Sequence, residues 1–406
     1  MQHSTTRVKV AHITTVDQSL RHLLLNQMRC IALAGYAVAG ISAPGPDVAY
    51  IEAAGIHHIA VPMSRSIAPL TDLAALSDLV GIMRRERFTI VHTHTPKAGL
   101  LGQLAARIAG VPIVINTLHG FYFHDHMAPA ARRFYIQIEK IAARCSDLIL
   151  SQNNEDIQTA IKEGICPAQR IKYLGNGIDL ALFDRAQILP LALQQKRAEI
   201  GIPASAHVVA FVGRLAARRK GFLDFLDAGR QLIQRLPNVW FLIVGDADSG
   251  KPDAVSPAVA SDYGIADRCI FLGQRPNAEL PYLYSLIDVL VLPSLFEGIP
   301  RVVMEASAMY VPIVASDVKG NREAVIHGEN GWLVPWGDVQ AIAHAIHEIL
   351  RDRDRARRMG AAGRRMAIER FDERLVFHYV KAEYSRLLRE KGLSIDQPQV
   401  RKKLFT

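Results

Sequence analysis

Residues 292–309 read LPSLFEGIPRVVMEASAM, and this stretch carries the strongest structural signal in the sequence. An apolar run that ends at Pro293 predicts a buried strand. A helix is expected from Pro300, because proline fits the first helical position. The loop between them holds Glu297, and Glu305 follows in the helix. Helix amino termini attract anions, so we expect a diphosphate here, with the two carboxylates accepting hydrogen bonds from ribose or hexose hydroxyls.

A second stretch, FVGRLAARRKGF at residues 211–222, places two cations after another buried strand. Val208–Val212 predicts the strand, and the loop that follows it carries Arg214 and Lys220. Open α/β sheets bind ligands at the carboxyl ends of their strands, and these cations suit a diphosphate. The alternative is simply a basic helix start, which the helix dipole disfavours. For the glutamate pair, the alternative is a surface loop and a solvated helix residue.

Short apolar runs alternate with longer amphipathic stretches along the whole chain, the pattern of β-α-β units. The first series predicts strands at Val8–Ile13, Ala37–Ile41, His58–Val61, Ile90–His92, Ile113–Thr117 and Leu148–Ser151, with helices at Leu20–Leu33, Leu70–Arg84, Ala98–Ala109 and Ala130–Ala143. The second predicts strands at Val208–Val212, Trp240–Val244, Cys269–Leu272, Val289–Leu292, Ile313–Ala315 and Trp332–Val334, then long helices at Val339–Leu350 and Phe371–Arg389.

These two series predict an α/β protein of two Rossmann-like, doubly wound domains facing a central cleft. We expect domain boundaries at residues 1–180 and 195–370, with 176–195 as the linker. A terminal helix at 371–390 would pack back on the first domain. The length of 406 residues suits two domains.

Composition narrows the class of protein further. The chain is 50% apolar and 21% charged, which excludes disorder as its main state. No apolar run approaches the roughly 18 residues of a membrane span, and the start lacks a signal-peptide core, so we expect a cytoplasmic protein. The four cysteines show no C-x-x-C spacing. We expect neither a disulfide framework nor a metal site, and we interpret His92-Thr93-His94 as a strand end.

The net charge of +9 is concentrated at the end of the chain. From Arg351 onward there are 16 Lys/Arg and 8 Asp/Glu, a surplus of +8, which leaves +1 for residues 1–350. We interpret this stretch as helix surface, with attraction to an anionic membrane as the alternative. A nucleic-acid-binding protein would usually spread such charge over a face with aromatics.

The motif G-R-L-x4-K-G at 213–221, followed by F-E-G-I-P-R-V-V-M-E at 296–305, resembles the retaining glycosyltransferases of family 4 with the GT-B fold. The resemblance covers nearly the whole chain. It includes HTHTPKAGLLG (92–102), NTLHGF (116–121), NGID (176–179), GNREAV (320–325) and NGWLVP (330–335).

The resemblance implies roles for matching residues. Arg214 and Lys220 would hold the donor diphosphate and neutralise the leaving group. Glu297 would contact the donor sugar in a loop shared with Gly298 and Ile299, and Glu305 would bind the ribose. His119 would lie on the acceptor side and contact the donor sugar or the transition state. The resemblance also implies that the acceptor attacks on the face from which the phosphate leaves, and that the leaving phosphate takes the acceptor's proton. Such a reaction would need neither a metal nor another cofactor.

Two departures from the family concern the sugar-binding parts. Many relatives have a Gly-Gly loop after the first strand, whereas this chain has TTVDQSLRH at 14–22. Asp17, Ser19 and Arg21 could contact the acceptor there, and an ordinary helix start capped by Asp17 or Ser19 is an equal alternative. Arg322 stands where a proline often precedes the glutamate Glu323, which bears on the donor-sugar pocket.

The overall pattern resembles bacterial enzymes that build capsule, O-antigen or exopolysaccharide units on a lipid carrier. We therefore expect transfer of a hexose or N-acetylhexosamine, from a UDP-sugar by preference, to a polyprenyl-diphosphate-linked saccharide. The enzyme would be peripheral on the inner face of the cytoplasmic membrane. Phe121, Tyr122 and Phe123, followed by a basic helix, could enter the bilayer interface, or pack in the core.

Three other functions remain as alternatives. A phosphorylase of the same fold would need a longer chain and a cofactor lysine, and a sugar-nucleotide epimerase would not be expected to carry these motifs. A basic nucleic-acid-binding protein would show strongly salt-dependent binding and no affinity for sugar nucleotides. A dinucleotide dehydrogenase is disfavoured because no G-x-G-x-x-G follows either leading strand.

Overall fold

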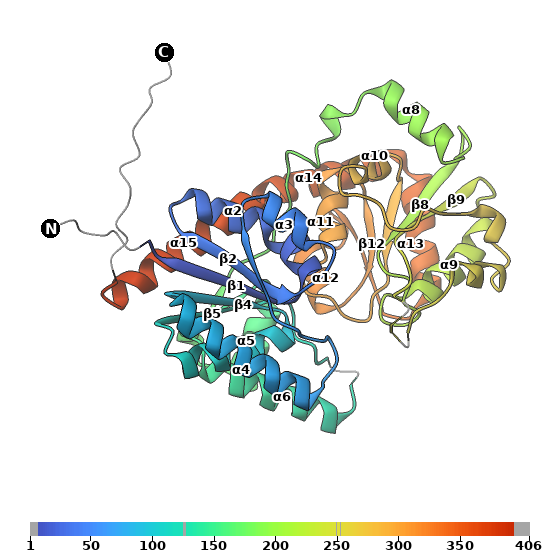
Figure 1. Ribbon diagram of the computed structural model, residues 1–406. Coiled ribbons are helices and arrows are strands. Elements are labelled where there is room, and N and C mark those ends of the chain that lie inside the picture. The colour runs from blue at the N-terminus through green and yellow to red at the C-terminus, as the bar shows by residue number, and fades with distance from the viewer. Residues whose placement is uncertain (1–6, 125–126, 249, 252, 394–406) are drawn as a thin grey trace, which may run out of the picture. The chain divides into compact units, whose positions relative to one another are not determined.

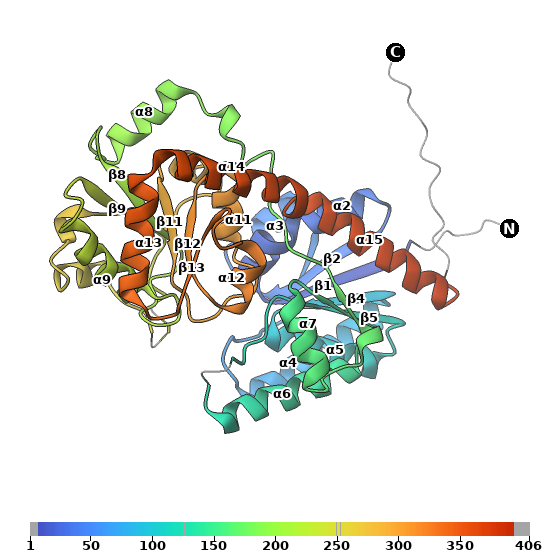
Figure 2. The same ribbon diagram turned by 180° about the vertical axis from the view of Figure 1, so that it is seen from behind.

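The computed structural model describes residues 7–124, 127–248, 250–251 and 253–393. The chain divides into two compact units. Unit 1 comprises Met1–Leu174 and Val376–Thr406, and unit 2 comprises Gly175–Leu375. Each unit contains one fully parallel sheet covered by helices on both faces, as the β-α alternation predicts (Figures 1 and 2).

The sheet of unit 1 has the order β3-β2-β1-β4-β5-β6-β7. Its central strands are continuous apolar runs because both faces are covered. The chain leaves β1 towards β2 on one side and returns to β4 on the other, so the carboxyl ends of β1 and β4 form the switch point at which such sheets bind ligands. The strands are β1 (Lys9–Val16), β2 (Ala37–Ala43), β3 (His57–Ala60), β4 (Ile90–His94), β5 (Ile113–Leu118), β6 (Leu148–Ser151) and β7 (Ile171–Tyr173).

The helices of unit 1 form two layers. Helices α4, α5 and α6 cover one face of the sheet, and α2, α3 and α15 cover the other (Figure 1). A π-helical turn, Leu20–Leu24, separates α1 from α2. The helices are α1 (Asp17–Ser19), α2 (Leu25–Leu33), α3 (Val48–Ala53), α4 (Pro69–Glu86), α5 (Pro96–Ala109), α6 (Pro129–Arg144), α7 (Asn154–Lys162) and α15 (Glu373–Glu390), which joins this unit from Val376.

Unit 2 repeats the same winding with the sheet order β10-β9-β8-β11-β12-β13, so its switch point lies between β8 and β11. Its strands are β8 (His207–Val212), β9 (Val239–Val244), β10 (Cys269–Phe271), β11 (Val289–Leu292), β12 (Ile313–Ser316) and β13 (Gly331–Val334). Its helices are α8 (Pro190–Glu199), α9 (Phe222–Ile233), α10 (Leu280–Ser285), α11 (Arg301–Ala308), α12 (Lys319–Ala324), α13 (Val339–Arg351) and α14 (Arg353–Arg370).

The structure departs from the sequence expectations at a few elements. Strand β7 was not expected, and the arginine-rich segment forms a separate helix, α14, between the two long terminal helices. The whole of the predicted linker, 176–195, belongs to unit 2, where Ile178 and Phe183 are buried in the core. Pro300 precedes α11 as its N-cap residue rather than starting the helix. Within the described ranges, every helix is too short or too polar to cross a bilayer.

Candidate active site

The predicted donor residues of unit 2 gather at its switch point, where the loops after β8 and β11 meet. Lys220 Nζ lies 2.5 Å from Glu297 Oε1, and both side chains are largely buried. Strands β8 and β11 are hydrogen-bonded neighbours, so their carboxyl ends deliver these two residues to one place. Opposite charges that are this close and largely shielded from water attract one another strongly, so each side chain fixes the position of the other. The structure therefore brings together a cation and a carboxylate 77 residues apart in sequence.

Glycines make the approach of these loops possible. Gly221 has a φ of 66°, and a Cβ there would lie 2.1 Å from the carbonyl oxygen of Pro293. A Cβ on Gly320, in the GNREAV motif, would lie 1.3 Å from the carbonyl oxygen of Gly298. Both positions therefore require glycine on steric grounds. The start of α12 thus packs directly against the loop that carries Glu297.

Arg214 pairs with a different carboxylate from the one that Lys220 contacts. Its Nη1 lies 3.3 Å from Asp248 Oδ2, and the side chain is 39% exposed. Gly213 precedes it with a φ of 150°, in the turn that follows β8. An exposed ion pair of this kind is weak, so the guanidinium can exchange its partner for a phosphate at little cost.

Glu305 is buried in α11, with only 5% of its surface exposed. It accepts a hydrogen bond of 2.9 Å from the Tyr284 hydroxyl, and Arg301 lies 3.6 Å from its other oxygen. Burial raises the pKa of Glu305, while Arg301 and the Tyr284 hydrogen bond oppose that rise. The carboxylate is thus held in one orientation, as a binding group for a pair of hydroxyls needs.

Two further residues expected near the donor sugar, Ile299 and Glu323, contact other parts of unit 2. Ile299 is buried at 5% exposure in the core of unit 2, and its carbonyl oxygen accepts a hydrogen bond from Asn176 of the NGID motif. Its side chain is therefore directed into the core, and only its backbone is available to a ligand. Glu323 pairs with Arg370 of α14 at 3.2 Å.

In unit 1 the predicted acceptor residues face the loop before α3. The Asp17 carboxylate accepts a 2.8 Å hydrogen bond from the backbone N–H of Asp47. Arg21 pairs with the Asp47 carboxylate at 2.5 Å and lies over the ring of Tyr50. The N-cap of α1 is Val16, so the alternative that Asp17 or Ser19 caps the helix is wrong. Ser19 is partly exposed within α1.

His119, which is partly exposed, lies after β5 and ends a chain of otherwise buried side chains that the sequence spacing did not predict. Its Nε2 is 3.2 Å from His94 Nδ1, and His94 Nε2 is 3.1 Å from His12 Nδ1. His92 completes the group between Tyr384 and Thr117, at 2.7 Å from each hydroxyl. Burial lowers the pKa of His119 to about 4 and that of His12 to about 3, so these rings are neutral at pH 7.

This histidine cluster was missed because His12 and His92 become neighbours only through the pairing of β1 with β4. One ligand atom from each of His12, His92 and His94 falls within 4.8 Å of the others, a spacing compatible with a metal. The rings of His92 and His94 are stacked at 4.3 Å, however, and ring nitrogens donate or accept in the ring plane. Stacking opposes convergence on one ion, and the arrangement as it stands is a hydrogen-bonded chain.

Parts of the two stretches considered for membrane contact have structural roles, whereas Tyr122, Arg357, Arg358 and Arg365 are exposed. Phe121 and Phe123 stack on one another in the core of unit 1 and are 8% and 4% exposed. Arg364 of α14 donates hydrogen bonds to the carbonyl groups of Phe183 and Ala308 and pairs with Asp184. Phe121 and Phe123 therefore pack in the core, as the alternative to membrane contact proposed, and Arg364 is part of the packing of unit 2.

Sequence reasoning also missed Glu139, on α6. Burial, and then the charge of Asp156, raises the pKa of Glu139 from 4.5 to about 7. At pH values between 4.5 and about 7, the Glu139 carboxyl is protonated in the folded chain but ionised in the unfolded chain. The free energy of unfolding therefore falls as the pH rises through this range. An ionised Glu139 thus destabilises the fold above neutral pH.

We expect the Glu139→Gln variant to match the wild type in unfolding free energy at pH 4.5 and to exceed it at pH 8. The expected gain at pH 8 is about 1 to 3 kcal/mol, because one pKa unit corresponds to roughly 1.4 kcal/mol. Urea unfolding at both pH values measures this difference. Glu52→Gln, at an exposed position, is the control. A gain that does not change with pH would contradict the account of Glu139.

Two Rossmann-like units, each built on a fully parallel sheet with a switch point, are the architecture of the GT-B class. Comparison with known families agrees. Residues 194–366 match the family model "Glycosyl transferases group 1", and residues 21–177 match "Glycosyl transferase 4-like domain". The chain belongs to this glycosyltransferase family and is a glycosyltransferase.

Several relatives extend over most of the chain. The UDP-Gal:alpha-D-GlcNAc-diphosphoundecaprenol alpha-1,3-galactosyltransferase of Escherichia coli is 29% identical over 87% of this chain and 90% of its own. The capsular polysaccharide biosynthesis glycosyltransferase CapM of Staphylococcus aureus is 27% identical over 94% of this chain and 98% of its own. The D-inositol 3-phosphate glycosyltransferase of Corynebacterium glutamicum is 30% identical over 71% of each chain.

Solved structures confirm the fold. The Anabaena protein Alr3699/HepE in complex with UDP and glucose matches with a TM-score of 0.80 at 23% identity, covering 94% of this chain and 100% of its own. WaaG, described as a glycosyltransferase involved in lipopolysaccharide biosynthesis, matches with a TM-score of 0.72 at 15% identity. The match covers 93% of this chain and 99% of the WaaG chain. At these identities the likeness concerns the GT-B fold alone.

Proposed function

We propose that this chain transfers a hexose or N-acetylhexosamine, with retention of configuration, from a UDP-sugar to a saccharide linked through diphosphate to a polyprenyl lipid. The product would be a repeat unit of a bacterial surface polysaccharide. The Lys220–Glu297 pair at the switch point of unit 2 is the observation that carries the reaction type. The E. coli relative, whose name states a UDP-sugar donor and a diphosphoundecaprenol acceptor, supports the substrates.

In the proposed reaction, the bond between the donor sugar and the diphosphate breaks and negative charge develops on the leaving diphosphate. Lys220, Arg214 and the amino-terminal amides of α11 stabilise this charge. Glu297 is held by Lys220 and contacts the donor sugar near its reacting carbon. The acceptor hydroxyl attacks from the same face, and the leaving phosphate takes its proton. The cationic side chains supply the charge that a metal would otherwise provide.

The nucleotide would be held by Glu305, whose fixed carboxylate accepts hydrogen bonds from the two ribose hydroxyls. Burial against Tyr284 and Arg301 keeps the group in place before the ligand arrives. A preorganised group loses little entropy on binding, which favours affinity.

The acceptor would bind unit 1 at the carboxyl edge of its sheet, near His119. Two observations favour this edge. It contains the switch point between β1 and β4, and Thr95 there adopts a φ of 66°. A β-branched residue in that conformation is strained, and such strain is concentrated at functional sites.

A lipid-linked acceptor would bring the enzyme to a membrane surface, and α6 offers a face for this contact. Phe134 and Ile141 are 52% and 48% exposed on it, and Arg133 and Arg144 are also exposed. Aromatic, aliphatic and cationic side chains together favour the interface of an anionic bilayer. Co-sedimentation with anionic and neutral vesicles tests this part of the proposal.

The other candidate functions have less support. The family match covers both units, and the paired Lys220 and Glu297 have no role in a sugar-nucleotide epimerase that we can derive. The C-terminal charge, on which a nucleic-acid-binding function would depend, is partly used within unit 2, as Arg364 shows.

A thermal-shift screen tests the donor assignment. A ligand that binds only the folded protein raises its melting temperature by mass action. We expect UDP and UDP-sugars at about 100 times their dissociation constants to stabilise the protein by about 2.7 kcal/mol. GDP-, ADP- and dTDP-sugars should give smaller shifts. A larger shift with another nucleotide would overturn UDP as the base, and no shift with any of them would overturn the site.

A further inference from the structure

Two adjoining cavities lie between α5, α6 and the sheet of unit 1, next to His119. They share Gln103, Asn116, Leu118, Glu139 and Ala142, and we call them together the α5–α6 recess. Side chains alternate along a strand, so Asn116 faces this recess while Thr117 faces the histidine cluster. Thr95 and Gly120, at the carboxyl edge of the sheet, line its outer part. The recess therefore begins where the acceptor is proposed to bind.

The polar groups of the recess offer a specific set of donors and an acceptor. The side-chain oxygen of Gln103 already accepts a hydrogen bond from Ser146, and that of Asn116 accepts one from Thr93. Their amide N–H groups have no partner within the described ranges, nor does the Glu139 carboxyl form a hydrogen bond or ion pair there. The recess thus provides two amide NH2 groups and one carboxyl group that are not used in other contacts of the described residues.

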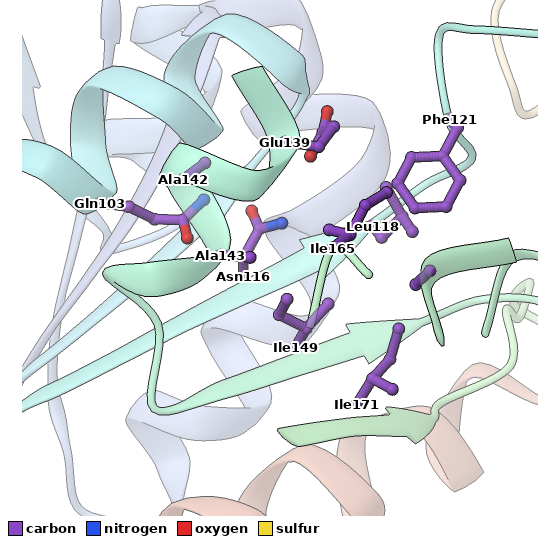
Figure 3. A pocket seen from close by; sticks show the side chains of 11 residues that line it. Gln103, Asn116, Leu118, Phe121, Glu139, Ala142, Ala143, Ile149, Ile165 and Ile171 are labelled. Atoms are coloured by element: carbon purple, nitrogen blue, oxygen red, sulfur yellow. The ribbon is translucent and has the colours of Figure 1, made fainter. Parts of the chain in front are cut away.

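The rest of the lining is apolar. Figure 3 shows Gln103 and Asn116 beside Ala142 and Ala143, with Glu139 on the same helix as these alanines, and larger apolar side chains on the other side of the inner cavity. The apolar side consists of Leu118, Phe121, Ile149, Ile165 and Ile171. No lysine or arginine is among the lining residues of the described chain, and His119 is neutral. The recess therefore favours a small uncharged group over a phosphate or a carboxylate.

When it is ionised, the Glu139 carboxyl lowers the free energy of unfolding, and no contact within the described ranges compensates for this. Its carboxyl is desolvated without a compensating partner, which raises its pKa to about 7. The Glu139 side chain is partly exposed at the recess, so its carboxyl group can be reached by a hydrogen-bonding ligand there. A ligand that donates to Glu139 would supply the missing partner.

We propose that the α5–α6 recess binds the 2-acetamido group of the acceptor's terminal sugar, so that Glu139, Gln103 and Asn116 select an N-acetylhexosamine acceptor. The acetamido carbonyl accepts from the amide groups of Gln103 and Asn116, and its N–H donates to Glu139. Its methyl group packs on the apolar side of the recess. This inference rests on the proposed function, since it assigns the acceptor of that reaction.

The test compares two acceptor probes that differ only at the 2-position, undecyl diphosphate carrying α-N-acetylglucosamine and undecyl diphosphate carrying α-glucose. Calorimetry gives the dissociation constant of each for the wild type, Glu139→Met and Glu139→Gln. Glu139→Met removes every polar atom at similar size, whereas Glu139→Gln keeps an oxygen that can accept the N–H. Circular dichroism and melting temperatures verify that each variant folds, and Glu52→Gln is the control.

We expect the wild type to bind the acetamido probe at least about tenfold more tightly, because a site built for a hydrogen-bonding group rejects a ligand that lacks it. The ratio should fall to about one in Glu139→Met, stay above about threefold in Glu139→Gln and be unchanged in Glu52→Gln. Equal affinities in the wild type, no binding of either probe, or an unchanged ratio in a folded Glu139→Met variant would overturn the inference.

Transfer rates to the same probes separate this inference from the proposed function. Transfer to both probes at equal rates would leave the transferase assignment intact and overturn the acetamido site alone. Transfer to neither probe, by protein that binds UDP normally, would overturn the proposed acceptor class as well.

Discussion

Replacing Lys220 with alanine is expected to lower the turnover number by about two to three orders of magnitude, the usual effect of removing one group that stabilises transition-state charge. Lys220 lies 2.5 Å from Glu297 at the switch point of unit 2. The substitution would remove a cation from the leaving diphosphate and also release Glu297 from its position. Because both losses act on the reacting centre, we expect the turnover number to change more than the dissociation constant of UDP.

The matched control is Lys196→Ala, also in unit 2. Lys196 is similarly buried, at 17% exposure, and forms ion pairs with Glu199 and Glu279, but it lies on α8, outside the β8 and β11 loops. We expect its activity to stay within about twofold of the wild type, since a partly exposed ion pair contributes little. Near-normal turnover in Lys220→Ala, or an equal loss in Lys196→Ala, would contradict the site assignment.

The second large effect is expected from Gly320→Ala. A Cβ at this position would lie 1.3 Å from the carbonyl oxygen of Gly298, so the backbone of one loop has to move. A clash with backbone cannot be relieved by a side-chain rotation, and we expect a loss of about 3 kcal/mol or more in unfolding free energy. The loop that carries Glu297 would be displaced, so UDP stabilisation and activity should fall together.

Gly81→Ala is the control for this variant. Gly81 is exposed within α4, and nothing lies within 4 Å of its Cβ position. Alanine there should be neutral or stabilising by up to about 1 kcal/mol, because glycine is a poor helix former. Urea unfolding, and the melting temperature with and without UDP, measure both variants. An unchanged stability of Gly320→Ala would show that α12 does not pack against the Glu297 loop as described.

The strands could be predicted well because strands of a covered parallel sheet are continuous apolar runs. Leu148–Ser151 and Val289–Leu292 have the predicted bounds, and the other expected strands differ at their ends by a few residues. Strand β7 has three residues, too few for a pattern to distinguish it from a loop. Helix α14 was not separated from its neighbours because its many arginines obscure the apolar stripe.

The proposed donor residues could be named because the short motifs that follow the strands resemble those of the family, and the pairing of Lys220 with Glu297 then follows from the adjacency of β8 and β11. The histidine cluster and Glu139 could not be found in the same way. His12 meets His92 and His94 only through a strand order that the sequence does not reveal. Glu139 lies on an amphipathic helix, where a glutamate is ordinarily solvated, and only the packing of α6 shows that it is desolvated.

The measurement that tests the account most directly is sugar transfer itself. Purified wild-type protein would be incubated with radiolabelled UDP-hexoses and undecyl diphosphate carrying α-N-acetylglucosamine, beside Lys220→Ala and Lys196→Ala. The account predicts a lipid-linked disaccharide with the anomeric configuration of the donor, formed by the wild type and Lys196→Ala and nearly absent with Lys220→Ala. A product of inverted configuration, or equal transfer by Lys220→Ala, would contradict it.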